Sequence, residues 1–196
     1  MKKIIVLLLI TVMAVGLMAG CGSQEAGGEK GTVYVYCFGD YFDPELEYQF
    51  EEETGYDVVI DLFDTNEEMY PVIKNNTAQY DVICASDYMI ERLISEDLLA
   101  EINYDNVPNA SNIADNIKPF MEEFDPGMVH SLPHTWGTYG IMYNKTMVNS
   151  EIDSWEDLWD TQYSGQIVMP NSMREGFMIA AKLLGYSMNT TNEAQI

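Results

Sequence analysis

Basic residues are scarce in this 196-residue sequence, in which nine Lys and Arg face 32 Asp and Glu for a formal net charge of −23. A surface this acidic repels nucleic acid and anionic lipid headgroups and attracts cations. The charge therefore argues against nucleic acid as a partner, although acidity can also serve solubility alone. Hydrophobic residues make up 47% and charged residues 21%, which is a globular composition.

Cysteine is also scarce, with three residues in the chain. After Cys21 only Cys37 and Cys84 remain, which is too few for a disulfide scaffold, so burial must hold the core together. A bond between neighbouring parallel strands would have strained geometry. We therefore predict two buried free thiols, with a disulfide as the alternative.

Sequence motifs of catalysis are missing. There is no Cys-x-x-Cys, Gly-x-Ser-x-Gly, Walker A or Gly-x-Gly-x-x-Gly pattern. His130 and His134 have the spacing of a metal pair on a helix, but Pro133 between them opposes a helix there. The sequence predicts no enzyme, no cofactor and no metal site.

The N-terminus has the features of an export signal. Two lysines precede an apolar run at residues 4–15 that is too short to span a membrane comfortably. The following Leu17-Met18-Ala19-Gly20-Cys21 resembles the lipobox of bacterial lipoproteins. We predict a lipoprotein signal peptide at residues 1–20, lipidation of Cys21 and a flexible tether at residues 21–31. This places the chain at the extracytoplasmic face of the cell membrane, held by a lipid anchor; an ordinary signal peptide with a chance Cys is the alternative.

Strand-like and helix-like segments alternate through the first half of the chain. Strands are expected at residues 32–37, 56–63 and 80–85, and helices at residues 44–54, 66–75 and 88–95. The alternation predicts an α/β fold with a parallel sheet of order 2-1-3 and helices on both faces of the sheet. The continuous apolar character of the third strand predicts that this strand is buried. Residues 131–144 predict a strand that crosses into a second lobe. Trp155 and Trp159, four apart, predict one packed helix face.

Polar and aromatic residues follow each of the three expected strands, at residues 38–41, 64–66 and 86–88. Ligands of open parallel sheets bind beyond the carboxyl ends of the strands. Any one of these residues could instead cap a helix or pack beneath a loop. The convergence of three loops at one edge predicts a binding site.

Six stretches of the sequence carry a family resemblance: "QFEEETGYDV", "DTNEEMY", "YDVICASDYMIERL", "SLPHTWGTYGIMYN", "SWEDLWD" and "REGFMIAAKLLGYSMNTTN". Together they resemble the substrate-binding lipoproteins of spermidine/putrescine ABC transporters. The resemblance implies the two-lobed, type 2 periplasmic-binding-protein-like fold, with lobe 1 at residues 32–130 and the hinge crossing and part of lobe 2 at residues 131–196. Full-length relatives are longer, so we expect the C-terminal part of the fold to be missing, with "NTTNEAQI" starting another helix.

The resemblance also implies the partners and the site: a polyamine between the lobes, and the permease subunits of an ABC transporter. By motif, the ligand-binding positions are Phe38, Asp40, Tyr41, Ser86, Tyr88, Trp136, Ser172 and Glu175. Gly39 lacks the hydroxyl that the family commonly has there, and Ser172 stands where an Asp is frequent, which leaves the preferred polyamine open. Trp136 could equally be a core residue beneath the hinge.

Two further interpretations remain open. The chain could bind another small ligand such as iron or thiamine, although the acidic site disfavours anions and no paired tyrosines for iron occur in lobe 2. It could also be an enzyme on the same scaffold, with Glu175 or Asp40 as a general base. An adhesive surface lipoprotein would not need three converging strand ends.

Overall fold

The computed structural model describes residues 30–196. The chain forms two compact units, of which unit 1 ends at Leu132 and unit 2 is Pro133–Ile196. The predicted signal peptide, Cys21 and all but the end of the tether lie outside the described residues. Within the described part of the chain, no helix is long and apolar enough to cross a membrane.

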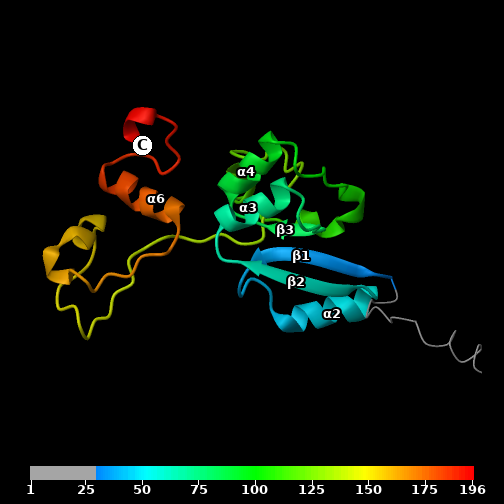
Figure 1. Ribbon diagram of the computed structural model, residues 1–196, viewed down its shortest axis with the longest axis horizontal. Coiled ribbons are helices and arrows are strands. Elements are labelled where there is room, and N and C mark those ends of the chain that lie inside the picture. The colour runs from blue at the N-terminus through cyan, green and yellow to red at the C-terminus, as the bar shows by residue number, and fades with distance from the viewer. Residues whose placement is uncertain (1–29) are drawn as a thin grey trace, which may run out of the picture. The chain divides into compact units, whose positions relative to one another are not determined.

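Unit 1 is built on a three-stranded parallel sheet (Figure 1). Its strands are β1 (Thr32–Phe38), β2 (Asp57–Phe63) and β3 (Val82–Cys84). The strand order is β2-β1-β3, so the predicted order is confirmed. Cys37 in β1 pairs with Leu62 of β2 on one side and with Cys84 of β3 on the other.

Strand β3 is shorter and more exposed than predicted. At its beginning the backbone N–H of Tyr34 donates to the carboxylate of Asp81 at 2.9 Å rather than to a backbone carbonyl. Val82 is 48% exposed, so the expectation of a fully buried third strand is wrong. A short edge strand with one face open to solvent is what the structure has instead.

Three helices connect and follow the strands of unit 1: α2 (Pro44–Thr54), α3 (Asn66–Lys74) and α4 (Asp87–Ser95). Asp43 caps α2 by accepting from the N–H of Glu45, and Gly55 ends it in the left-handed conformation at φ 76°. Thr65 caps α3 by accepting from the N–H of Glu68. The three predicted helices are confirmed, and local capping signals fix both ends of α2 and the start of α3.

The core of unit 1 lies between one face of the sheet and helices α3 and α4. Figure 1 shows these two helices on one side of the sheet and α2 on the other. The buried cluster consists of Tyr36, Phe63, Met69, Met89 and Leu93. Helix α2 has no buried residue, so helices flank both faces but only the α3/α4 side forms a dense core.

The two cysteines of β1 and β3 are free thiols. Burial raises the pKa of the Cys37 thiol, and it raises that of Cys84 to about 11. Cys37 is buried whereas Cys84 is only partly so. The expectation of two buried thiols is therefore right for Cys37 and wrong for Cys84.

The second half of unit 1 is mostly irregular. It contains 3₁₀ turns at Tyr104–Asn106 and Pro108–Asn112 and the short helix α5 (Lys118–Met121). A tight turn follows α5, in which Gly127 and Met128 both have positive φ angles. The chain then continues into unit 2.

Unit 2 contains helix α6 (Met173–Leu183) and 3₁₀ turns at Trp155–Trp159, Thr161–Tyr163 and Glu193–Gln195. The strand predicted at residues 131–144 is wrong: those residues form no strand, since no described segment pairs with them. The prediction that Trp155 and Trp159 share one helix face is also wrong. They lie in a 3₁₀ turn, which has three residues per turn, so residues four apart point in different directions. The helical turn expected near the last residue is confirmed, with Asn192 accepting from the N–H of Ala194.

Candidate functional site

The loop after β1 presents two rings and a carboxylate. The Phe38 ring meets Phe63 of the core at 4.4 Å and the Tyr41 ring at 5.3 Å between centroids. Asp40 is exposed and has the left-handed backbone conformation at φ 60°. Burial raises the pKa of the Tyr41 hydroxyl, and the nearby thiols of Cys84 and Cys37 add to the effect. Core packing thus holds the rings while the carboxylate faces solvent.

The loops after β2 and β3 are tied together by one side chain, the buried amide of Asn66. Its Nδ2 donates to Ser86 Oγ at 2.9 Å and to the Tyr88 hydroxyl at 3.0 Å. Its Oδ1 accepts from the backbone N–H of Ser86 at 3.2 Å. The Tyr88 hydroxyl in turn donates to Glu67 Oε1 at 3.0 Å.

The structure therefore brings Ser86 and Tyr88 together through Asn66, which was not among the predicted ligand-binding positions. The signal for its role was its place at residues 64–66, one of the three strand-end loops predicted to converge. Its hydrogen bonds to the loop after β3 could not be predicted from that position.

Ser86 does not cap helix α4, although it stands at the capping position. Its side chain makes no cap hydrogen bond there, because the hydroxyl lies against Asn66 instead. Asp87 takes the local role, with Oδ1 accepting from the N–H of Tyr88 at 2.7 Å. Helix capping, the alternative role for a residue at this position, therefore does not apply to Ser86, whose hydroxyl belongs to the inter-loop network.

In unit 2 the predicted carboxylate, Glu175, lies in the first turn of α6. Its Oε1 accepts a 2.6 Å hydrogen bond from the hydroxyl of Tyr139, a residue that the sequence analysis did not assign. Its Oε2 is buried and has no hydrogen-bond partner among the described residues. Leaving a charged oxygen unsatisfied costs free energy, so this arrangement favours a cationic donor at Oε2.

The two other predicted residues of unit 2 lie in different settings. Ser172 precedes α6 at the capping position without a side-chain cap bond. Trp136 is 70% exposed, so it is not a core residue of its unit. Of the three predicted residues in unit 2, Glu175 is the one that the structure holds in place, through its hydrogen bond with Tyr139.

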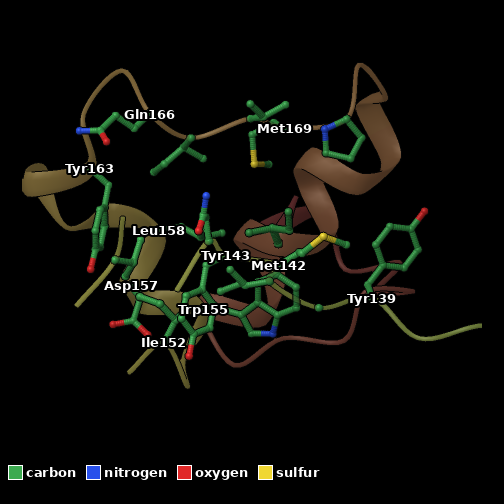
Figure 2. Close-up of a pocket in the computed structure, with 18 of the residues that line it drawn as sticks. Tyr139, Met142, Tyr143, Ile152, Trp155, Asp157, Leu158, Tyr163, Gln166 and Met169 are labelled. Atoms are coloured by element: carbon green, nitrogen blue, oxygen red, sulfur yellow. The ribbon is translucent and has the colours of Figure 1, made fainter. Parts of the chain in front are cut away.

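Unit 2 also contains a cavity of about 640 Å³ with mainly apolar walls (Figure 2). None of the predicted ligand-binding residues lines it. Its one carboxylate, Asp157, already accepts from the backbone N–H groups of Asp153 and Ser154. The cavity therefore does not match a ligand with ammonium ends.

No group of three or more His, Cys, Asp or Glu side chains among residues 30–196 is arranged to hold a metal ion. The polar groups gathered at the strand ends of unit 1 are hydroxyls, an amide and carboxylates. Such groups bind by hydrogen bonding and charge, which is the chemistry of a site for a small polar solute.

Comparison with known proteins identifies the family of this chain. The family described as bacterial extracellular solute-binding protein matches residues 46–196. The chain belongs to this family. Members of the family bind solutes outside the cytoplasm, and the name says nothing of catalysis.

Some individual relatives carry names that state which solute they bind. The spermidine/putrescine-binding periplasmic protein of Escherichia coli K12 is 32% identical over 187 residues, covering 94% of this chain and 53% of that protein. The substrate-binding protein PotD of a spermidine/putrescine ABC transporter from Streptococcus pneumoniae is 38% identical, with a TM-score of 0.65 over 84% of this chain and 50% of that one. The TpPotD lipoprotein of Treponema pallidum is 26% identical, with a TM-score of 0.73 over 84% and 51%.

These likenesses confirm the predicted periplasmic-binding-protein-like fold. The solute-binding chain spans about half the length of the relatives it matches.

Proposed function

We propose that this chain acts in the substrate-binding component of an ABC importer and captures polyamines such as spermidine and putrescine. The observation that carries the proposal is the buried, unpartnered Oε2 of Glu175, which the Tyr139 hydroxyl holds in place from the other oxygen. A protonated amine supplies the charge-assisted hydrogen bond that this oxygen lacks. The formal charge of −23 attracts such a ligand over longer distances.

The strand ends of unit 1, taken by themselves, also suit a polyamine. A ring face such as those of Phe38 and Tyr41 attracts an ammonium group by roughly 0.5 to 2 kcal/mol. Each methylene removed from water against such rings adds about 0.8 kcal/mol. Asp40 offers a carboxylate to an ammonium end, and Ser86 and Tyr88 offer hydroxyl oxygens.

The remaining parts of the proposal rest on sequence and relatives. Trp136 supplies an exposed ring, and Ser172 a hydroxyl near the first turn of α6. Cys21 carries the lipid anchor that holds the protein outside the cell membrane, which the lipoprotein nature of the Treponema pallidum relative supports. The permease subunits of an ABC transporter are the partners to which the ligand is delivered.

Calorimetric titration with putrescine and spermidine tests the proposal. We expect saturable heat with the wild-type chain and about tenfold weaker binding of both polyamines by Glu175→Gln, which keeps the shape and the Tyr139 bond but removes the charge. Glu193→Gln, which removes a charge elsewhere in unit 2, is the matched control and should bind like wild type. Unchanged affinity in Glu175→Gln would contradict the proposal, and conversion of either polyamine into product would favour an enzyme.

Two aspartates of unit 1 should differ in their effect on binding. Asp40→Asn is expected to weaken polyamine binding more than Asp87→Asn, because Asp40 is exposed at the strand end whereas Asp87 accepts from a backbone N–H at the start of α4. Dissociation constants from the same titrations measure the difference. Equal losses in the two variants would refute the assignment of Asp40.

A further inference from the structure

We infer that Asn66 is a positioning residue of the proposed site, which turns the oxygens of Ser86 and Tyr88 into hydrogen-bond acceptors for an ammonium group. The inference rests on the proposed function, because it concerns how the same site recognises a protonated amine. Nothing in the resemblance assigns this residue a role. Its basis is the direction of four hydrogen bonds.

The orientation of the Asn66 amide is fixed by a backbone group. The N–H of Ser86 can only donate, so the atom that it meets at 3.2 Å must be the carbonyl oxygen Oδ1. The amide nitrogen must then face Ser86 Oγ and the Tyr88 hydroxyl, at 2.9 and 3.0 Å. Since Asn66 is only 5% exposed, water does not compete for these bonds.

The direction of the other bonds follows. Because Asn66 donates to both hydroxyl oxygens, neither hydroxyl donates its own proton to Asn66. The proton of Tyr88 goes to Glu67 Oε1 at 3.0 Å, and a bond to a carboxylate increases the negative charge on the phenol oxygen. An ammonium group has three donors and no acceptor, so it requires oxygens presented in this way.

The strand order explains why a side chain is needed for this task. Strands β2 and β3 lie on opposite sides of β1, so their backbones are not hydrogen-bonded to each other. Asn66, directly after β2, reaches residues 20 and 22 positions later in the loop and helix after β3. The amide therefore sets the relative position of two loops that the sheet itself leaves unconnected.

The test is a double-mutant cycle read by polyamine affinity. Asn66→Ala should weaken putrescine and spermidine binding about tenfold in the wild-type background, since the two hydroxyls lose their donor. In a Ser86→Ala/Tyr88→Phe background the same substitution should change affinity less than twofold, because its targets are gone. Thr65→Ala is the matched control: it removes the cap bond to the N–H of Glu68 on the same helix and should lower the unfolding midpoint without changing affinity.

The results of this cycle distinguish a failure of the proposed function from a failure of the positioning role of Asn66. If wild type gives no heat with either polyamine, the proposed function fails, and this inference with it. If wild type binds but Asn66→Ala costs the same in both backgrounds, or if Thr65→Ala weakens binding equally, only the positioning role fails. Should Asn66→Ala not fold, Asn66→Thr, which keeps one hydroxyl donor, replaces it in the same cycle. It should again cost more affinity in the wild-type background than in the Ser86→Ala/Tyr88→Phe background, and equal costs would refute the positioning role.

Discussion

Replacing Asp125 with alanine is expected to lower the free energy of unfolding of unit 1 by about 3 kcal/mol or more. Asp125 is 2% exposed and organises the turn that ends this unit. Its Oδ2 accepts from the backbone N–H groups of His130 and Ser131 and from the Ser131 hydroxyl, and its Oδ1 accepts from the N–H of Val129. Alanine would leave three backbone donors without their acceptor in a partly buried loop.

Urea unfolding followed by the fluorescence of the tyrosine-rich core measures this effect. Asp125→Asn should destabilise less, because the amide oxygen can still accept the three bonds at Oδ2 and only the bond to Val129 is lost. Asp115→Ala is the control, since Asp115 forms only an exposed ion pair with Lys118 and its removal should barely move the midpoint. A change in Asp125→Ala no larger than in the control would show that the turn does not depend on this carboxylate.

Hydrogen exchange is expected to divide the chain into a protected and an unprotected half. The amides of Val35–Cys37 lie in the central strand of the sheet, and we expect them to exchange at least about a thousandfold more slowly than those of residues 140–143 and 167–169. The two latter segments donate no backbone hydrogen bond among the described residues. Equally strong protection in both units would contradict the expectation.

The same two segments should promote self-association. They line the cavity of unit 2, and Met142 and Val168 within them are 97% and 94% exposed. Segments with unpaired backbone groups and exposed apolar side chains favour edge-to-edge association. Val168→Lys should therefore reduce the aggregated fraction in light scattering more than Met173→Lys, which adds the same charge at an exposed methionine on α6. Equal aggregated fractions in the two variants would show that residues 167–169 do not mediate the self-association.

The sequence correctly predicted the features that depend on short-range signals. Helices α2 and α3 start and end close to the predicted positions because Asp43, Gly55 and Thr65 act on backbone groups only two to four residues away. The parallel sheet and its order followed from the alternation of segments, which restricts how the chain can connect. The edge at which Phe38, Asp40 and Tyr41 lie followed from the same reasoning.

Predictions failed where a segment's state depends on a distant partner. Residues 131–144 have strand-like composition, yet a strand needs a hydrogen-bonding neighbour and the described chain provides none. The prediction for Trp155 and Trp159 failed for a local reason instead: their spacing is α-helical, but a capping box between Ser154 and Asp157 begins a 3₁₀ turn there. The predicted burial of β3 failed because this strand lies at the edge of the described sheet, where Val82 is exposed.

The sequence by itself determined the acidic charge, the local helix ends, the parallel α/β fold and the membership of a solute-binding family, because composition, capping and motifs are properties of short stretches. Only the tertiary structure decided that Asn66 joins Ser86 to Tyr88 and that Tyr139 holds Glu175, with one carboxylate oxygen left unpartnered. These pairs are separated by 20 to 36 positions. Side chains so far apart in the chain meet only when the sheet order and the loop paths bring them together, and no local pattern encodes which of them will share a hydrogen bond.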